Sequence, residues 1–307
     1  MKKFVIKSII MALIVAGIVA GAEALSMDPR TKAVMTKLTN SEDYAGEESG
    51  TADIVSIIRK AKEADDTTVL VIGDSIARQM LTGLQEECPE VKIDCANAAV
   101  NISGQYMLAA EYLNSHPGAT DVWLFAHPLT LTRTYDLELG YGYAVMPFAM
   151  EDSLKYLDDE TIDQMASVYG RVALNGTVAG LINRSTMNRK LFSTYIRMNS
   201  AEYEQDNSYE IASRYLIKLK QLCDEKGVTL HFYSSPSTEY YRDKIEETRS
   251  DFEASEFSKV FPDYLDSIYY FPTEWSGDYS HFGGDYADRR TYDFVLSEAY
   301  DEFFTEL

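Results

Sequence analysis

The sequence predicts an α/β fold, a three-layer α/β/α sandwich with a central parallel sheet, on two observations. The first is a continuous run of β-branched and apolar residues at 67–72, which is typical of a strand buried on both faces. The second is the alternation of such runs with helical patterns, because parallel strands need a crossover connection that is usually a helix. A helical and loop insertion at about 135–200 interrupts this alternation.

The predicted elements follow one another from residue 53 onward. Asp53–Ala64 has apolar residues at helical spacing. The main strands are expected at 67–72, 91–95, 121–126 and 228–233, with a further short strand at 268–271. Further helices are expected at 75–87, 105–114, 159–168, 202–226 and 285–304. The insertion is expected to cover one end of the sheet.

Composition restricts the classes of protein that the chain can belong to. The chain has 307 residues, 46% of them hydrophobic and 25% charged, which is an ordinary globular balance. Its net charge of −21 repels phosphate backbones, so nucleic acid is not an expected partner. The three cysteines form no metal-ligand motif, and no metal or cofactor is expected. A Cys88–Cys95 disulfide depends on an oxidising compartment.

The N-terminal segment, residues 1–25, reads as an export signal. Three lysines precede an apolar stretch that ends in Ala22-Glu23-Ala24, the form of a cleavable signal peptide. The stretch is also just long enough for an uncleaved membrane anchor, and the sequence leaves both interpretations open. Either one places the body outside the cytoplasm. A stalk and first helix at 26–66 follow, with a flexible linker expected at Asn40–Thr51, and a domain at 67–307.

The main chemical feature is Gly73-Asp74-Ser75, directly after the first buried strand and at the start of a helix. Ligands of open parallel sheets bind at the carboxyl ends of strands, so a serine here is exposed at the sheet edge. Its N–H also lies at a helix N-terminus, where the dipole favours developing negative charge. Taken alone, the tripeptide is also consistent with a serine that merely caps the helix N-terminus.

Two further motifs follow in the chain. Asp278-Tyr279-Ser280-His281 precedes the last helix, and a histidine can take a serine proton when a carboxylate fixes its tautomer. Ile102-Ser103-Gly104 follows the second strand, and a glycine N–H there can approach an oxyanion without steric hindrance. Each motif alone is also consistent with an ordinary polar loop.

The three motifs together, in this order, resemble the SGNH/GDSL hydrolase superfamily over roughly residues 67–306. The resemblance implies an SGNH/flavodoxin-like sheet, Ser75 as nucleophile, and Asp278 and His281 as its acid–base partners. It also implies an oxyanion hole made by the N–H groups of Ser75 and Gly104. The Gly-x-Ser-x-Gly elbow of α/β-hydrolases is absent from the sequence.

One block departs from this family. The family places an oxyanion-hole asparagine after the third strand, where this sequence has His127. We expect His127 to replace it as a donor, or the hole to consist of two backbone N–H groups. Asp74, Tyr279 and Trp275 are predicted to bind substrate, because aromatic faces suit sugar rings and these residues adjoin the predicted triad.

The layout of a basic N-terminus, one apolar segment, a stalk and this domain resembles membrane-anchored accessory proteins of cell-envelope acylation. Examples are alginate O-acetyltransferase accessory proteins and the teichoic-acid D-alanylation protein. The resemblance implies acyl transfer from an ester donor to a polysaccharide acceptor, or the reverse deacylation, beside a membrane-bound O-acyltransferase.

Two alternatives remain open at the level of sequence. A secreted GDSL lipase or carboxylesterase would use the same triad on small or lipid esters without an acceptor. A non-catalytic carbohydrate-binding protein on the same scaffold would bind glycans independently of Ser75.

Overall fold

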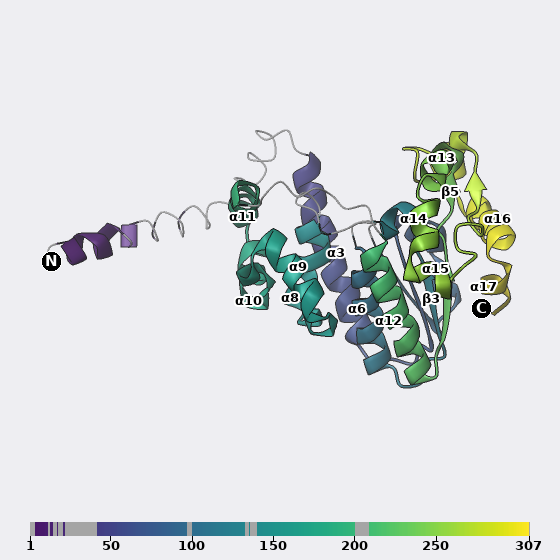
Figure 1. The fold of residues 1–307 in the computed structure, drawn as a ribbon, viewed down its shortest axis with the longest axis horizontal. Helices are drawn as coiled ribbons and strands as arrows, with labels where there is room; N and C mark the ends of the chain where they lie inside the picture. Colours follow the sequence, from purple (N-terminus) through teal and green to yellow (C-terminus); the bar gives the residue numbers. More distant parts are fainter. Residues whose placement is uncertain are drawn as a thin grey trace.

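The structure is a computed structural model in which helices surround a central parallel sheet (Figure 1). Parts of the N-terminal segment and a few short internal stretches lie outside the described residues. The described residues are 4–11, 13, 14, 17, 21, 42–96, 100–132, 135, 140–199 and 209–306.

Four parallel strands form the sheet, and this confirms the prediction of an α/β fold with a central parallel sheet. They are β1 (Val69–Gly73), β2 (Val91–Cys95), β3 (Asp121–Phe125) and β4 (Thr229–Tyr233). Their spatial order is β2-β1-β3-β4, so the chain first moves to one side of β1 and then to the other. The register sets Gly73 level with Cys95 and Phe125. The carboxyl ends of β1, β2 and β3 therefore meet at one edge, where ligands of such sheets bind.

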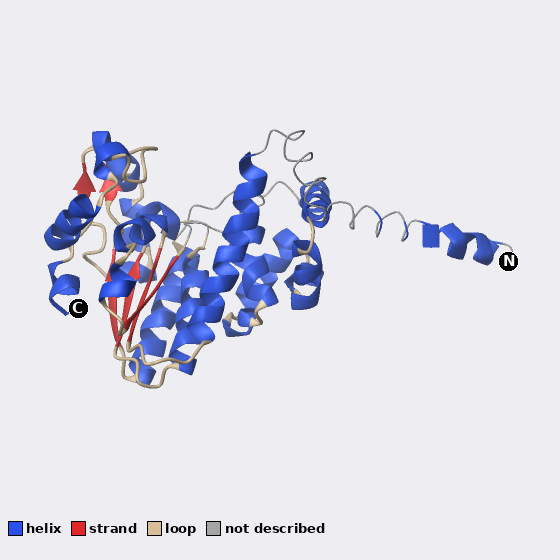
Figure 2. Cartoon of the chain, turned by 180° about the vertical axis from the view of Figure 1, so that it is seen from behind, coloured by secondary structure: helices blue, strands red, loops and turns tan. Residues whose placement is uncertain are grey.

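Alternating residues of the strands supply two apolar cores, one on each face of the sheet. Leu70 and Ile72 belong to the larger core, whereas Val71 belongs to the smaller one. The larger core is shared with α3 (Glu42–Lys62), α6 (Ile102–Ser115) and α12 (Glu210–Lys226). The smaller core is shared with α4 (Ser75–Leu81), α5 (Leu84–Glu87), α16 (Arg289–Ala299) and α17 (Asp301–Glu306). Figure 2 shows helices on either side of the strands.

Two predicted helices are each divided in the structure. The helix expected at 75–87 breaks at Gly83, which has a left-handed φ of 90° and separates α4 from α5. The helix expected at 285–304 is replaced by η6 (Gly284–Tyr286) followed by α16 and α17. Tyr300 interrupts it because its backbone, with φ of −142° and ψ of 45°, is not helical. Apolar spacing alone did not indicate either break.

The described part of the insertion contains helices, as expected. It packs mainly against α3, however, rather than covering an end of the sheet. In Figure 1, α8 to α10 lie beside α3 and away from the strands. Its elements and the preceding short helix are α7 (Pro128–Leu131), η1 (Tyr141–Val145), α8 (Met146–Met150), η2 (Ser153–Tyr156), α9 (Asp159–Tyr169), η3 (Arg171–Leu174), α10 (Gly176–Asn183) and α11 (Thr186–Asn199).

The short strand expected at 268–271 exists, but it does not join the main sheet. β6 (Tyr270–Phe271) instead pairs in parallel with β5 (Ser237–Thr238). This pair lies beyond the carboxyl end of β4. It joins the segment that follows β4 to the segment that leads into the predicted triad loop. Short helices complete the region: η4 (Glu239–Tyr241), α13 (Arg242–Glu246), α14 (Arg249–Ala254), α15 (Glu256–Val260) and η5 (Thr273–Trp275).

The N-terminal predictions are tested only in part. The linker expected at Asn40–Thr51 is wrong over most of its length, because the backbone is helical from Glu42 onward. The proposed cleavage site at 22–24 lies outside the described residues. No helix within the described ranges is long and apolar enough to cross a bilayer.

Cys88, Cys95 and Cys223 carry free thiols, so the suggested Cys88–Cys95 disulfide is not formed.

Candidate functional site

Ser75 lies where the strand–turn–helix pattern predicts it, as the first residue of α4 after the end of β1. Gly73 is required by close packing at this turn, because a Cβ there would lie 2.7 Å from the carbonyl oxygen of Phe125. The Ser75 N–H has no hydrogen-bond partner within the described ranges. This donor, in the first turn of α4, is therefore not used by the described part of the fold.

Asp74 is a structural residue, which corrects its predicted role in substrate binding. Its side chain is buried, with the residue only 2% exposed. One carboxylate oxygen accepts the N–H groups of Ile76 (3.0 Å) and Ala77 (3.2 Å), capping α4, and the other accepts the N–H of His127 (2.8 Å). Burial raises the pKa of this carboxyl, although these hydrogen bonds lower it. Asp74 fixes the turn that presents Ser75.

The structure brings Ser75, His281 and Asp278 into one hydrogen-bonded chain. His281 Nε2 lies 2.8 Å from Ser75 Oγ, and His281 Nδ1 lies 2.8 Å from Asp278 Oδ2. Asp278 Oδ1 also accepts the backbone N–H of His281 at 2.7 Å and of Ser280 at 3.0 Å. Serine, histidine and carboxylate are thus linked in the order required for nucleophilic catalysis.

The charge state of Asp278 suits this arrangement. Burial acts to raise the pKa of Asp278. Hydrogen bonds from the backbone and ring of His281 and from the Ser280 N–H together lower the pKa by more than burial raises it, so it lies below its ordinary value. The carboxylate is therefore ionised at neutral pH and accepts the Nδ1–H of His281. This fixes the tautomer in which Nε2 is an acceptor facing Ser75. The side chains of His281 and Asp278 are 38% and 60% exposed, so the site is open to solvent.

Gln79 is a positioning residue that the sequence analysis missed. It lies one helical turn after Ser75 on α4, and its amide makes two hydrogen bonds with the backbone of Phe282. Gln79 Nε2 donates to the Phe282 carbonyl (2.7 Å), and Gln79 Oε1 accepts the Phe282 N–H (2.9 Å). The helix that carries the serine is therefore clamped directly to the residue after His281. A polar residue four positions after Ser75 was the only available signal, because the two partners are 203 positions apart.

The loop that carries Asp278 and His281 is closed on itself. Ser276 and Phe282 form an antiparallel bridge, and Gly277 N–H donates to the His281 carbonyl at 2.9 Å. A Cβ on Gly283 would lie 2.4 Å from the Cα of Gly277, so only glycine permits this approach. The loop between Asp278 and His281 is thus held in a rigid turn. Because the loop is already ordered, little conformational entropy is lost when a substrate binds.

The two other predicted oxyanion donors have structural partners instead. Gly104 N–H donates to the Asn101 carbonyl (2.9 Å) and approaches its side-chain oxygen (3.3 Å), as part of the first turn of α6. The lack of a side chain at Gly104 serves packing, because a Cβ would lie 3.3 Å from the Phe148 ring and 2.5 Å from Val100. The predicted role of Gly104 in the oxyanion hole is therefore not supported by this geometry.

His127 caps α7 and is buried, with 8% exposure. Its Nδ1 accepts the N–H of Leu129 at 3.3 Å, which places the ring proton on Nε2. Nε2 then donates to Ser237 Oγ, 3.0 Å away. Because both ring nitrogens have partners in the fold, His127 holds β5 against the end of β3 and does not present an N–H to a substrate.

The two aromatic residues predicted to bind substrate differ in placement. Tyr279 lies within the triad loop, is 55% exposed, and packs its ring against Tyr240 at 4.6 Å between centroids. Trp275 instead stacks on Tyr286 at 5.1 Å and 14°. Trp275 is half-buried in this stack at the base of the loop, whereas Tyr279 is exposed and available to a ligand.

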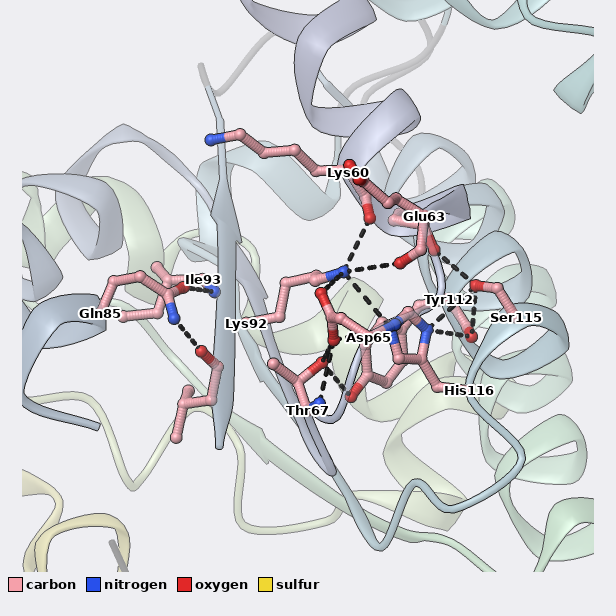
Figure 3. Close-up of polar contacts among 12 residues, drawn as sticks. Lys60, Glu63, Asp65, Thr67, Gln85, Lys92, Ile93, Tyr112, Ser115 and His116 are labelled. Carbon is pink, nitrogen blue, oxygen red and sulfur yellow. Dashed lines mark hydrogen bonds and ion pairs between the residues drawn. The ribbon is translucent and has the colours of Figure 1, made fainter. Parts of the chain in front are cut away.

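A second polar region lies along the outer strand β2, between α3 and α5. Figure 3 shows the Lys92 ammonium pointing toward Asp65 and His116, with Gln85 on the other side of the strand. Lys92 Nζ lies 2.7 Å from Asp65 Oδ2 and donates to the carbonyl groups of Lys60 (2.8 Å) and Glu63 (3.1 Å). It neutralises the C-terminal end of α3, where a cation is favourable.

This region borders an open cavity of about 650 Å³ that is lined in part by Lys60, Arg78, Ile93 and Asp94. The cavity is separate from the hydrogen bonds of Ser75 and His281. No group of three or more potential metal ligands occurs in the described part of the chain.

Comparisons of the chain with protein-family models, with curated proteins and with solved structures give no match.

Proposed function

We propose that this protein carries out serine-dependent acyl transfer, as an O-acetyltransferase or esterase, on a cell-envelope polysaccharide. The observation that carries the proposal is the chain of two 2.8 Å contacts from Ser75 Oγ through His281 to Asp278. Its position supports the same conclusion, because the serine opens a helix at the carboxyl edge of a parallel sheet.

In the proposed reaction, His281 Nε2 accepts the Ser75 proton while Oγ attacks the carbonyl carbon of an ester. The Ser75 N–H stabilises the developing oxyanion, and Asp278 stabilises the imidazolium without taking its proton. The ester C–O bond then breaks, and His281 returns the proton to the departing alcohol. An acyl group remains on Ser75 until water or an acceptor hydroxyl attacks it.

The fold supports an SGNH/flavodoxin-like assignment of the three-layer sandwich. The strand order β2-β1-β3-β4, the helices on both faces and the Ser75-first, His281-last order of the triad all agree with it. The oxyanion hole departs from the family, because Gly104 and His127 are used by the fold. We infer that the hole relies on the N–H of Ser75, which has no hydrogen-bond partner within the described ranges.

The N-terminal segment extends the proposal to location and partner. Three lysines followed by an apolar stretch support export, with the body extracytoplasmic and either secreted or held at the membrane. A membrane-bound O-acyltransferase is the partner that such a layout favours, since it would supply the acyl group.

A secreted GDSL lipase or carboxylesterase is the alternative within the same chemistry, and transfer to an added acceptor separates the two. A non-catalytic carbohydrate-binding protein is the second alternative. It is favoured by one observation, the engagement of Gly104 and His127 by structural partners, which leaves the oxyanion site with fewer donors.

The test is covalent labelling of the full-length protein with p-nitrophenyl acetate. Nitrophenol release and intact mass are followed for wild type, Ser75→Ala and His281→Ala. Ser297→Ala, on an exposed face of α16, is the matched serine control. We expect an acetyl adduct and turnover in wild type and in Ser297→Ala, and neither in the triad variants. Equal nitrophenol release by wild type and Ser75→Ala would refute acyl transfer at this site.

A further inference from the structure

Two tyrosine rings form an exposed aromatic pair beside the triad. Tyr240 is 58% exposed and Tyr279 is 55% exposed. Their ring centroids are 4.6 Å apart, with an angle of 33° between the planes. Two large rings that contact each other and still face water leave apolar surface that the fold does not bury. We call Tyr240 and Tyr279 the tyrosine platform.

The backbone at Tyr279 is held in an unfavourable conformation. Its φ of 67° is left-handed, a region that bulky residues seldom adopt; Asp152 is the other non-glycine residue with positive φ in the described ranges. The Thr238 hydroxyl, from a fully buried residue, donates to the Tyr279 carbonyl at 2.7 Å and fixes this conformation. Such strain concentrates at functional sites, and here it lies between Asp278 and His281.

Tyr240 is positioned independently, from the segment that follows β5. Its ring packs edge-on against Tyr241 at 5.0 Å and 82°, and Tyr241 in turn packs edge-on against His127 at 6.1 Å. The β5–β6 pairing, which joins Thr238 to Phe271, holds this segment beside the triad loop. The platform is therefore assembled before any ligand arrives, which lowers the entropic cost of binding.

We propose that the tyrosine platform binds a pyranose ring of a neutral or amino-bearing polysaccharide and presents one of its hydroxyl groups to acyl-Ser75. The electron-rich face of an aromatic ring attracts the C–H groups on the apolar face of a sugar. The net charge of −21 repels polyuronates and similar polyanions. Trp275 is excluded from the platform because it is half-buried in its stack with Tyr286, whereas both tyrosines are more than half exposed.

This inference rests on the proposed acyl transfer. In the transfer step, the sugar hydroxyl oxygen bonds to the acyl carbon, and the bond between that carbon and Ser75 Oγ breaks. His281 Nε2 takes the hydroxyl proton and returns it to Oγ, so the enzyme is regenerated without any other reactant.

The platform is tested by glycan binding to the full-length Ser75→Ala protein, so that no reaction intervenes. The probes are tetrasaccharides of cellulose, chitosan and polygalacturonate, which are neutral, cationic and anionic. Tyr279→Gly removes the ring and keeps a residue that accepts φ of 67°. Tyr240→Ala removes the second ring, and Tyr195→Ala on α11 removes an equally exposed tyrosine as the control.

We expect the neutral or cationic probe to bind, with Kd raised roughly 3- to 10-fold by Tyr279→Gly and by Tyr240→Ala, and unchanged by Tyr195→Ala. Three outcomes would overturn the proposed role of the platform: no binding of either the neutral or the cationic probe, strongest binding of the anionic probe, or equal binding in all variants. This outcome is distinct from failure of acyl transfer, which is read separately as the absence of an acetyl adduct on wild-type Ser75.

Discussion

Asp94→Asn tests whether a buried carboxyl on strand β2 sets the pH dependence of stability. Asp94 is 1% exposed, and neither carboxyl oxygen has a hydrogen-bond partner among the described residues. Lys92, the cation that most lowers this pKa, directs its ammonium to Asp65 instead. Burial therefore raises the pKa of Asp94 from 3.8 to about 7, and Lys92 and Lys60 offset only part of this rise.

The sign of the effect follows from the raised pKa. The folded state binds the Asp94 proton more tightly than the unfolded chain, so folding is favoured at low pH and loses stability as pH rises from about 4 to about 7. A rise of about 3 pKa units corresponds to about 4 kcal/mol at 1.36 kcal/mol per unit. Asparagine cannot ionise, so the variant avoids this loss.

We expect Asp94→Asn to gain up to about 4 kcal/mol relative to wild type between pH 4 and pH 8, or roughly 8 °C in Tm. Urea and thermal unfolding of the full-length protein, followed by circular dichroism across this range, measure the difference. The control is Asp53→Asn, on the wall of the same cavity with its side chain 52% exposed. If the difference between wild type and Asp94→Asn is the same at both ends of the range, the reasoning is refuted.

Three further predictions concern the candidate site. Asp278→Asn should lower kcat for p-nitrophenyl acetate about 10,000-fold at pH 7, because the amide favours the wrong tautomer of His281; a loss below tenfold would contradict the triad. Gln79→Leu should lower kcat roughly 10- to 100-fold with little change in KM, because the triad loop loses its clamp to α4; an equal loss in the control Gln85→Leu would assign the effect to stability. Gly104→Ala should lower stability by about 1–3 kcal/mol, since its Cβ meets Val100 and Phe148. Its activity per folded molecule should match wild type, and a selective loss of kcat would restore Gly104 to the oxyanion hole.

The sequence predicted the features that depend on local patterns. β-branched runs predicted the four strands of the main sheet, and alternation with helices predicted their parallel arrangement. Because parallel strands end at one edge, Gly73-Asp74-Ser75 could be placed at that edge from its position after the first strand. The pairing of Asp278 with His281 was also accessible, since three positions separate them on one turn.

Only the tertiary structure decided which polar groups near Ser75 are available and which are used by the fold. Asp74 and His127 both follow strand ends, as binding residues do. The Asp74 carboxylate, however, accepts the backbone N–H of His127, and the His127 ring bonds to Leu129 and Ser237, so both side chains are structural. The contact of Gln79 with Phe282 and that of Tyr240 with Tyr279 join segments distant in sequence. Local sequence specifies where a strand or turn forms, but the partner of a polar side chain depends on packing between remote segments, because burial makes an unpaired group costly only once those segments meet.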